Sequence, residues 1–213
     1  MDPQDFATQF DVSRETLARL LAYQALLGRW QQRINLVGPA TLDDFWARHA
    51  ADSAQLLALA GHRRVWMDLG SGGGFPGLVV AIMLTGSEGH VHLVESDGRK
   101  AAFLRTVIRE VGAAASVHNR RAEALAEAQA PLLADVQVIS ARALAPLPEL
   151  LELIAPFFNS STIALLHKGA GWKDELTRAE QCWNIDVEAL PSRTHDAARI
   201  LHLRHLSHRG EAS

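Results

Sequence analysis

Apolar residues in the first sixty positions follow the three- and four-residue spacing of helices that bury one face. The first group is Leu17, Leu20, Leu21, Leu27 and Trp30, and the second is Phe45, Trp46, Leu56 and Leu57. Two or more helices are therefore expected before residue 61, with an interruption at 35–39, where glycine and proline break the pattern. Thr41 is the predicted N-cap of the second helical region, with Asp43 and Asp44 in its first turn.

Short apolar runs alternate with helical segments from Val65 onward, which is the pattern of a parallel sheet with helices on both faces. Strands are expected near 65–69, 90–95, 115–118, 135–140 and 162–167. Two further runs, 185–190 and 200–206, are close enough in sequence to pair antiparallel at the sheet edge. Helices are expected at 77–84, 99–111, 123–129, 147–158 and about 172–183. The prediction is an α/β protein with a mainly parallel, seven-stranded sheet, in which 1–60 form a helical extension and 61–213 form the core of one compact unit.

The most specific local pattern is segment 65–77, in which an apolar strand carries Asp68 and is followed by a glycine-rich turn. The turn contains Gly70, Gly72 and Gly74. Because these residues lack a Cβ, the backbone there can turn sharply and approach a ligand closely. A nicotinamide dinucleotide fingerprint would require glycine where Phe75 stands, which disfavours that class of cofactor.

A second acidic residue, Glu95, ends the strand-like run that begins at His90. It lies about as far from the glycine turn as the ribose-binding acid of comparable βαβ units, so Glu95 is a candidate ribose ligand. Asp68, the open glycine turn and Glu95 together resemble the S-adenosylmethionine (SAM) site of Rossmann-like methyltransferases.

Ligands of open α/β sheets bind beyond the carboxyl ends of the strands, where the strand order reverses. The candidate residues follow expected strands: Gly70, Glu95, Arg120, Arg121, Arg142 and Lys168. This convergence predicts one shared site. Ala122 and Glu123 follow the third strand, where an adenine ring is expected. Glu123 would accept from an exocyclic amine or cap the next helix, and both interpretations stay open.

Composition limits where the protein acts and what it binds. The chain has 213 residues, of which 48% are hydrophobic, enough to bury a full core. It has no apolar run of about 18 residues and no signal-peptide pattern after Met1, so a cytoplasmic location without membrane contact is expected. The single cysteine, Cys182, fits a reducing compartment. With a net charge of −3, any contact with RNA is expected to be local.

Several kinds of chemistry are disfavoured. Covalent catalysis by cysteine is not expected, because Cys182 falls in the predicted helix 172–183, away from the strand ends. The run 139–143 lacks the Asn/Asp-Pro-Pro-aromatic motif of many enzymes that methylate exocyclic amines. No metal site is expected, since His202 and His205 would point to opposite faces of a strand. The four histidines near the C-terminus are interpreted as solvated: His195, His202, His205 and His208.

Separated segments of the chain together resemble the RsmG (GidB) family, bacterial methyltransferases that modify guanine N7 in small-subunit (16S) ribosomal RNA. The resemblance extends over about residues 20–206. It rests on Asn35-Leu36, Arg48-His49-Ala50-Ala51-Asp52-Ser53, Asp68 through Gly77, Glu95-Ser96, Arg99-Lys100, Phe103-Leu104, Arg121-Ala122-Glu123, Ser140-Ala141-Arg142-Ala143 and Lys168-Gly169. It implies SAM as cofactor and 16S rRNA or the small ribosomal subunit as partner. It also implies that SAM contacts Gly70, Phe75, Ala122, Glu123 and Arg142.

Guanine N7 offers a lone pair and carries no proton, so direct attack on the sulfonium methyl needs no covalent nucleophile and, in principle, no general base. The enzyme would mainly position the reactants, an effect worth about 7–11 kcal/mol in well-oriented cases. Arg142 and Lys168 are expected to orient the cofactor carboxylate, an RNA phosphate or guanine O6.

The expected site thus has two parts. The cofactor would be bound by Asp68, Gly70, Gly72, Gly74, Phe75, Glu95, Ala122, Glu123 and Arg142. The RNA would be bound by Arg48, Arg99, Lys100 and Lys168, and a monomer is expected. Two alternatives remain: a SAM-dependent enzyme with a small-molecule or protein substrate, and a non-catalytic nucleotide-binding module.

Overall fold

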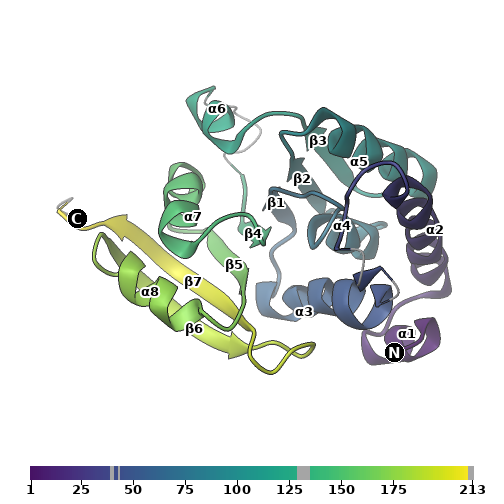
Figure 1. The fold of residues 1–213 in the computed structure, drawn as a ribbon, viewed down its shortest axis with the longest axis horizontal. Coiled ribbons are helices and arrows are strands. Elements are labelled where there is room, and N and C mark those ends of the chain that lie inside the picture. The colour runs from purple at the N-terminus through teal and green to yellow at the C-terminus, as the bar shows by residue number, and fades with distance from the viewer. Residues whose placement is uncertain (39–40, 43, 129–134, 211–213) are drawn as a thin grey trace.

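The computed structural model describes residues 1–38, 41–42, 44–128 and 135–210. Its centre is a seven-stranded sheet in the order β3-β2-β1-β4-β5-β7-β6 (Figure 1). The parallel part consists of β1 (Val65–Leu69), β2 (His90–Val94), β3 (Ala115–His118), β4 (Val138–Arg142) and β5 (Ile163–Lys168). β6 (Trp183–Pro191) and β7 (Arg199–His208) form an antiparallel hairpin, and β7 pairs with β5. The predicted mainly parallel sheet with an antiparallel edge is confirmed, and its order reverses between β1 and β4.

Alternate residues of the strands enter two apolar cores, one on each face of the sheet. Trp66 and Leu93 belong to the first core, whereas Met67 and Leu69 belong to the second. The first is covered by α1 (Pro3–Gln9), α2 (Arg14–Gln31), the π-helix η2 (Phe45–Ala50), α3 (Ala51–Ala60), α4 (Gly77–Leu84) and α5 (Gly98–Val111). The second is covered by α6 (Ala122–Glu127), α7 (Leu147–Ile154) and α8 (Trp172–Ala179). Figure 1 shows these two groups of helices on opposite sides of the sheet. Burial on both faces explains why the central strands read as continuous apolar runs.

The N-terminal helices share the first core with the sheet. Phe6, Tyr23 and Phe45 are fully buried in the same cluster as Trp66 of β1. Ser13 begins α2 by accepting a hydrogen bond from the Thr16 amide at 3.1 Å, which satisfies one of the unpaired amides of the first turn. The helical extension therefore packs directly against the elements that position the glycine loop.

Thr41 is not the N-cap that the sequence predicted. The π-helix begins at Phe45, and Asp44 precedes it without a capping hydrogen bond from its side chain. The Thr41 hydroxyl instead donates to the Gly38 carbonyl at 2.8 Å and lies 3.0 Å from Nε2 of His49. The hydroxyl is thus used for a tertiary contact, and Asp43 lies outside the described residues.

Several predicted boundaries moved. The predicted helix 147–158 ends at Ile154 and continues as a 3-10 turn, because Pro156 has no amide proton for the α-helical ladder. The strand expected at 135–140 runs from Val138 to Arg142, so Arg142 is its last residue. The last helix ends at Ala179, which puts Cys182 in an exposed turn, not in a helix. The expected end of helix 123–129, at Gln129, lies outside the described residues.

The expectation that His202 and His205 point to opposite faces is wrong. An irregularity in the β6–β7 register pairs His205 with Asp186 and His202 with Glu188. Asp186 and Glu188 are two residues apart on β6 and share a face, so the histidines opposite them also share one. Across the described segments, no group of three or more His, Cys, Asp or Glu side chains is arranged to hold a metal ion. None of the helices in these segments is both long and apolar enough to cross a membrane.

Candidate functional site

The glycine loop follows β1 and crosses the end of β2. The amides of Gly70 and Ser71 donate to the Val94 carbonyl at 2.9 and 3.1 Å. Gly70, Gly72 and Gly74 have φ angles of 66°, 53° and 96°, which L side chains rarely adopt. The sharp turn expected at these glycines is therefore present.

Asp68 supports this loop from behind. Its side chain is fully buried, accepts from the Ser140 hydroxyl at 2.7 Å and accepts from the Gly77 amide at 3.2 Å. Burial raises the pKa of Asp68 to about 6, although these hydrogen bonds oppose the shift. Asp68 thus connects the end of the loop to β4. It would act on a ligand indirectly, by fixing the backbone of the glycine loop.

Glu95 joins the loop to the start of α5. One carboxylate oxygen accepts from the Gly72 amide at 2.8 Å, and the other accepts from the Asp97 amide at 2.7 Å. The residue is 7% exposed. Each carboxylate oxygen has a further lone pair, so these two bonds leave Glu95 capacity to accept from ligand hydroxyls.

A cavity of about 1080 Å³ opens at the carboxyl edge of the sheet. Its walls come from the glycine loop, the π-helix, the segments that follow β4 and β5, and the β6–β7 turn. Of the expected site residues, those that line it are Gly70, Gly72, Phe75, Arg48, Lys100, Arg142 and Lys168. The cavity lining does not include Asp68, Gly74, Glu95, Ala122, Glu123 or Arg99. The structure therefore brings seven of the thirteen expected residues together at one cavity, whereas the other six lie outside its lining.

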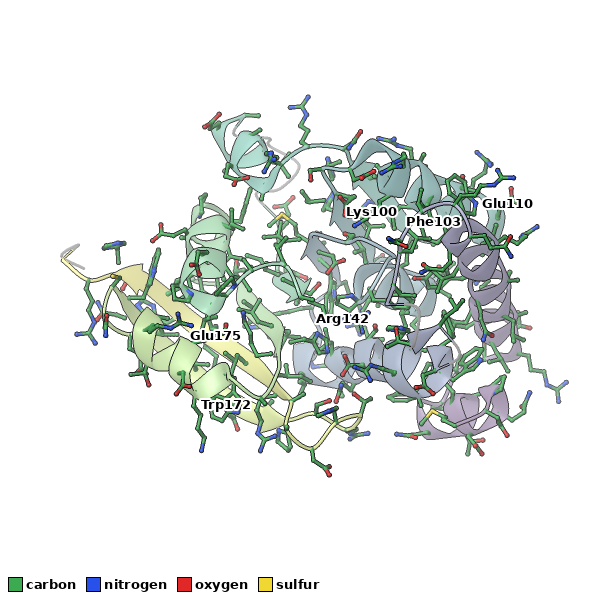
Figure 2. The ribbon with its side chains drawn as sticks, viewed as in Figure 1. Lys100, Phe103, Glu110, Arg142, Trp172 and Glu175 are labelled. Carbon is green, nitrogen blue, oxygen red and sulfur yellow. The ribbon has the colours of Figure 1, made fainter. Side chains whose placement is uncertain are left out.

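Arg142 is held on three sides within this cavity. Its Nη2 donates to Nδ1 of His49 at 3.0 Å, and its Nη1 lies 3.6 Å from Oδ2 of Asp52. The guanidinium carbon lies 5.0 Å from the centre of the Phe75 ring, within the range of a cation–π contact. In Figure 2, Arg142 lies near the centre of the molecule, with Lys100 of α5 above it and Glu175 of α8 to its left.

His49 serves this arrangement as a neutral acceptor. Its ring stacks on Phe75 with centroids 4.6 Å apart, and Nε2 lies 3.0 Å from the Thr41 hydroxyl. Burial, with a further contribution from Arg142, lowers the pKa of His49 to about 4. A neutral ring with its proton on Nε2 would donate to Thr41 and keep the Nδ1 lone pair for Arg142.

Asp52 connects four parts of the chain around the cavity. Its Oδ1 accepts from Gln55 at 2.8 Å and from the Thr194 hydroxyl at 2.9 Å. Its Oδ2 lies near Arg142 of β4 and 3.4 Å from Nε2 of His167 in β5. Within the segment Arg48–Ser53, the sequence assigned Arg48 to the RNA but indicated no site role for His49 or Asp52. The recurrence of polar residues within a buried helix was the one available signal.

Lys168 is buried and forms an ion pair with the half-buried Glu175. Its ammonium donates to Glu175 at 2.8 Å and to the Ala145 carbonyl at 2.7 Å. Burial tends to raise the pKa of Glu175, but the bonds from Lys168 and the Leu147 amide outweigh it and lower that pKa. The pair anchors α8 and the segment after β4 at the cavity wall.

The segment after β4 is bent by an unusual backbone conformation. Ala143 has φ 53°, a left-handed value that costs a non-glycine residue of order 1 kcal/mol or more. The following residue, Leu144, is 38% exposed and lies against Gly70, where a Cβ would come within 2.6 Å of it. Glycine at position 70 is therefore required by its φ of 66°, whereas the flexible end of the exposed Leu144 side chain could move aside.

The sheet order, the glycine loop at the end of β1 and the cavity at the carboxyl edge define a Rossmann-like methyltransferase fold. The precorrin-6y C5,15-methyltransferase of Geobacter metallireducens GS-15 is similar in structure, with a TM-score of 0.50 and 13% identity over 71% of this chain and 86% of that one.

The family model described as rRNA small subunit methyltransferase G (GidB) matches residues 16–202, and the chain belongs to this family. It is 54% identical over 207 residues to ribosomal RNA small subunit methyltransferase G of Rhodospirillum centenum, covering 97% of this chain and 92% of the relative. It is 50% identical over 209 residues to the protein of the same name from Parvibaculum lavamentivorans, covering 97% and 90%. The family resemblance expected from the separated sequence segments is confirmed.

Proposed function

We propose that this protein transfers a methyl group from SAM to N7 of a guanine in 16S ribosomal RNA. The carrying observation is that the cavity presents Arg142 beside the glycine loop, in a chain of the rRNA small subunit methyltransferase G family. Three acid–base side chains on the wall are already engaged: His49 accepts from Arg142, Asp52 accepts from Gln55 and Thr194, and Glu175 accepts from Lys168. Side chains held in these hydrogen bonds are not needed as general bases if the methyl acceptor is guanine N7, because this atom carries no proton to remove.

The residues present fit SAM as the cofactor. SAM supplies an electrophilic methyl group on a sulfonium. Gly70 and Gly72 line the cavity without a Cβ, so the backbone can approach the cofactor closely. Arg142 offers a held guanidinium for the cofactor carboxylate, and Phe75 offers an apolar ring at the cavity wall. Glu95 would accept from the ribose hydroxyls, with Ala122 and Glu123 beside the adenine, and Asp68 and Gly74 would hold the loop in shape.

Basic residues on the cavity rim support an RNA substrate. Arg48 is exposed and Lys100 is half-buried, and both line the cavity. Because the net charge is −3, these positions would act as a local patch for phosphates in folded RNA. Because Lys168 is paired with Glu175, we assign it mainly to holding the cavity wall in position. It would contact the RNA only at the edge of the cavity. A monomeric state and a cytoplasmic location stay predictions.

Methyl transfer from labelled SAM tests the proposal directly. The purified protein is incubated with small ribosomal subunits, with naked 16S rRNA, and with total cell protein or small molecules, and methylated RNA is mapped by mass spectrometry. We expect label on one guanine, as 7-methylguanine. Label on protein or small molecules alone would favour another SAM-dependent enzyme. Binding of SAM without any transfer would favour a nucleotide-binding module, and calorimetry showing tight NAD binding without SAM binding would exclude a methyltransferase.

A further inference from the structure

A second, smaller cleft lies next to the main cavity. It has a volume of about 280 Å³ and is lined by Arg33, Ile34, Asn35, Asp97, Arg99 and Lys100. These residues come from the connection after α2 and from the beginning of α5. We call it the basic cleft. Lys100 lines both the basic cleft and the main cavity, so the two are adjacent.

Three of the lining residues are cationic and one is acidic. The acidic residue, Asp97, caps α5: its Oδ1 accepts from the amides of Arg99 and Lys100 at 2.7 and 3.2 Å. These bonds lower the pKa of Asp97, so it stays ionised. Arg99 lies 3.8 Å from the other Asp97 oxygen, but its side chain is 76% exposed, which makes that pair weak. The cleft is thus locally positive in a protein of net charge −3.

The wall formed by the connection after α2 is held in place. The Gln31 side chain donates to the Val37 carbonyl at 2.8 Å and accepts from the amides of Leu36 and Val37 at 2.9 and 3.1 Å. Leu36 in turn packs on the glycine loop, where a Cβ on Gly73 would come within 2.9 Å of its carbonyl oxygen. The Tyr23 hydroxyl donates to the Gly73 carbonyl from the same helix, α2. The basic cleft and the glycine loop therefore form one rigid unit, so an anion in the cleft is held at a fixed position relative to the cofactor site.

We propose that the basic cleft binds a backbone phosphate of the RNA next to the nucleotide that enters the main cavity. This inference rests on the proposed function and adds a subsite that includes Arg33. Guanidinium groups suit a phosphate because they donate two parallel hydrogen bonds to its oxygens. Lys100, between the two cavities, would contact the same phosphate from the cavity side. Through this contact the enzyme would set the register of the RNA, since phosphate contacts fix position and carry no sequence information.

Arg33→Gln tests the subsite, with Arg29→Gln as the matched control. Both positions are exposed arginines near the end of α2, but Arg29 lines neither cavity. We expect Arg33→Gln to raise the KM for 16S rRNA about tenfold, as for the loss of one charge-assisted hydrogen bond. It should lower the log–log salt slope of RNA binding by about 0.7–0.9. The dissociation constant of SAM, measured by calorimetry, should stay unchanged, and Arg29→Gln should behave as the wild type.

The outcomes separate the subsite from its alternatives. Equal effects of Arg33→Gln and Arg29→Gln would show only general charge attraction and would overturn the proposal. A weaker SAM affinity with unchanged RNA binding would assign the cleft to the cofactor. Inorganic phosphate is also titrated at constant ionic strength. If Arg33→Gln abolishes phosphate binding but leaves the KM for RNA unchanged, the cleft is a site for free anions, and the RNA-phosphate proposal is wrong. Failure of the wild type to methylate RNA would contradict the proposed function itself, a result that does not depend on Arg33.

Discussion

Arg142 and His49, 93 positions apart in the chain, are joined by a 3.0 Å hydrogen bond in which the guanidinium donates to the imidazole Nδ1. The bond requires a neutral imidazole, because a protonated ring has no lone pair to offer. Phe75 lies beside both groups, under the guanidinium and stacked on the imidazole. The orientation of the Arg142 guanidinium thus depends on the protonation state of His49, a residue of the π-helix.

Replacement of His49 should reveal this dependence. In His49→Asn, the amide oxygen occupies nearly the position of Nδ1 and can still accept from Arg142, so we expect most of the activity to remain. In His49→Leu, no acceptor remains, and kcat/KM should fall about tenfold or more, as for a lost hydrogen bond to a charged group. Thermal unfolding of both variants controls for stability. Equal activity in the two variants would mean that the bond does not position Arg142.

The pH dependence of stability follows from the lowered pKa of His49, about 4 in the folded state against 6.5 ordinarily. Between these values the unfolded chain binds a proton that the folded protein does not, so stability is retained above pH 6.5 and lost as the pH falls toward 4. The slope is at most about 1.4 kcal/mol per pH unit for one such group.

Other titratable groups also change the slope of unfolding free energy against pH, so the contribution of His49 has to be measured by comparing variants. His92, with its pKa lowered to about 4 by burial, acts in the same direction. Asp68, with its pKa raised to about 6, acts in the opposite direction, because the folded protein then binds the additional proton between pH 3.8 and 6. Denaturant unfolding from pH 5 to 7 should give a flatter dependence for His49→Asn than for the wild type. Superimposable curves would mean that His49 titrates normally.

Gly77→Ala should disrupt the glycine loop. A Cβ at this position would lie 2.4 Å from Leu93 and 2.6 Å from Oδ2 of Asp68, both of which are buried. We expect a loss of about 1–3 kcal/mol in unfolding free energy, typical of overpacking, together with weaker SAM binding. Gly28→Ala is the control, since nothing lies within 4 Å of its Cβ position in α2, and helix propensity should make this variant up to about 1 kcal/mol more stable. If Gly77→Ala leaves the unfolding free energy and SAM binding unchanged, the side chains of Asp68 and Leu93 can move to make room for the methyl group.

Cys182→Ser should leave methyl transfer nearly unchanged. Cys182 is exposed and lies at the start of β6, whereas the cavity lies beyond the other end of this strand, at Thr194. Nine residues of extended strand span about 30 Å, too far for a nucleophile that reacts in the cavity. Steady-state kinetics check this expectation, and a loss of several orders of magnitude in a folded variant would indicate covalent catalysis.

Features that depend on neighbouring residues could be predicted from the sequence. The apolar runs gave the strands, because a strand buried on both faces needs apolar side chains at consecutive positions. The glycine turn with Asp68 and Glu95 indicated the loop, since only glycine combines left-handed φ angles with close approach. Their common location at the carboxyl edge followed from the general rule for open α/β sheets.

Contacts between distant segments were decided by the tertiary structure. The order of β1, β4 and β5 in the sheet brings Arg142 and His167 to Asp52, and the β6–β7 turn adds Thr194 to the same carboxylate. Lys168 was expected to bind RNA and to orient the reactants, yet its ammonium is paired with Glu175 because α8 packs against the segment after β4. Local spacing determines which element a residue joins. Its side-chain partners depend on how the elements pack, and no short-range pattern records that arrangement.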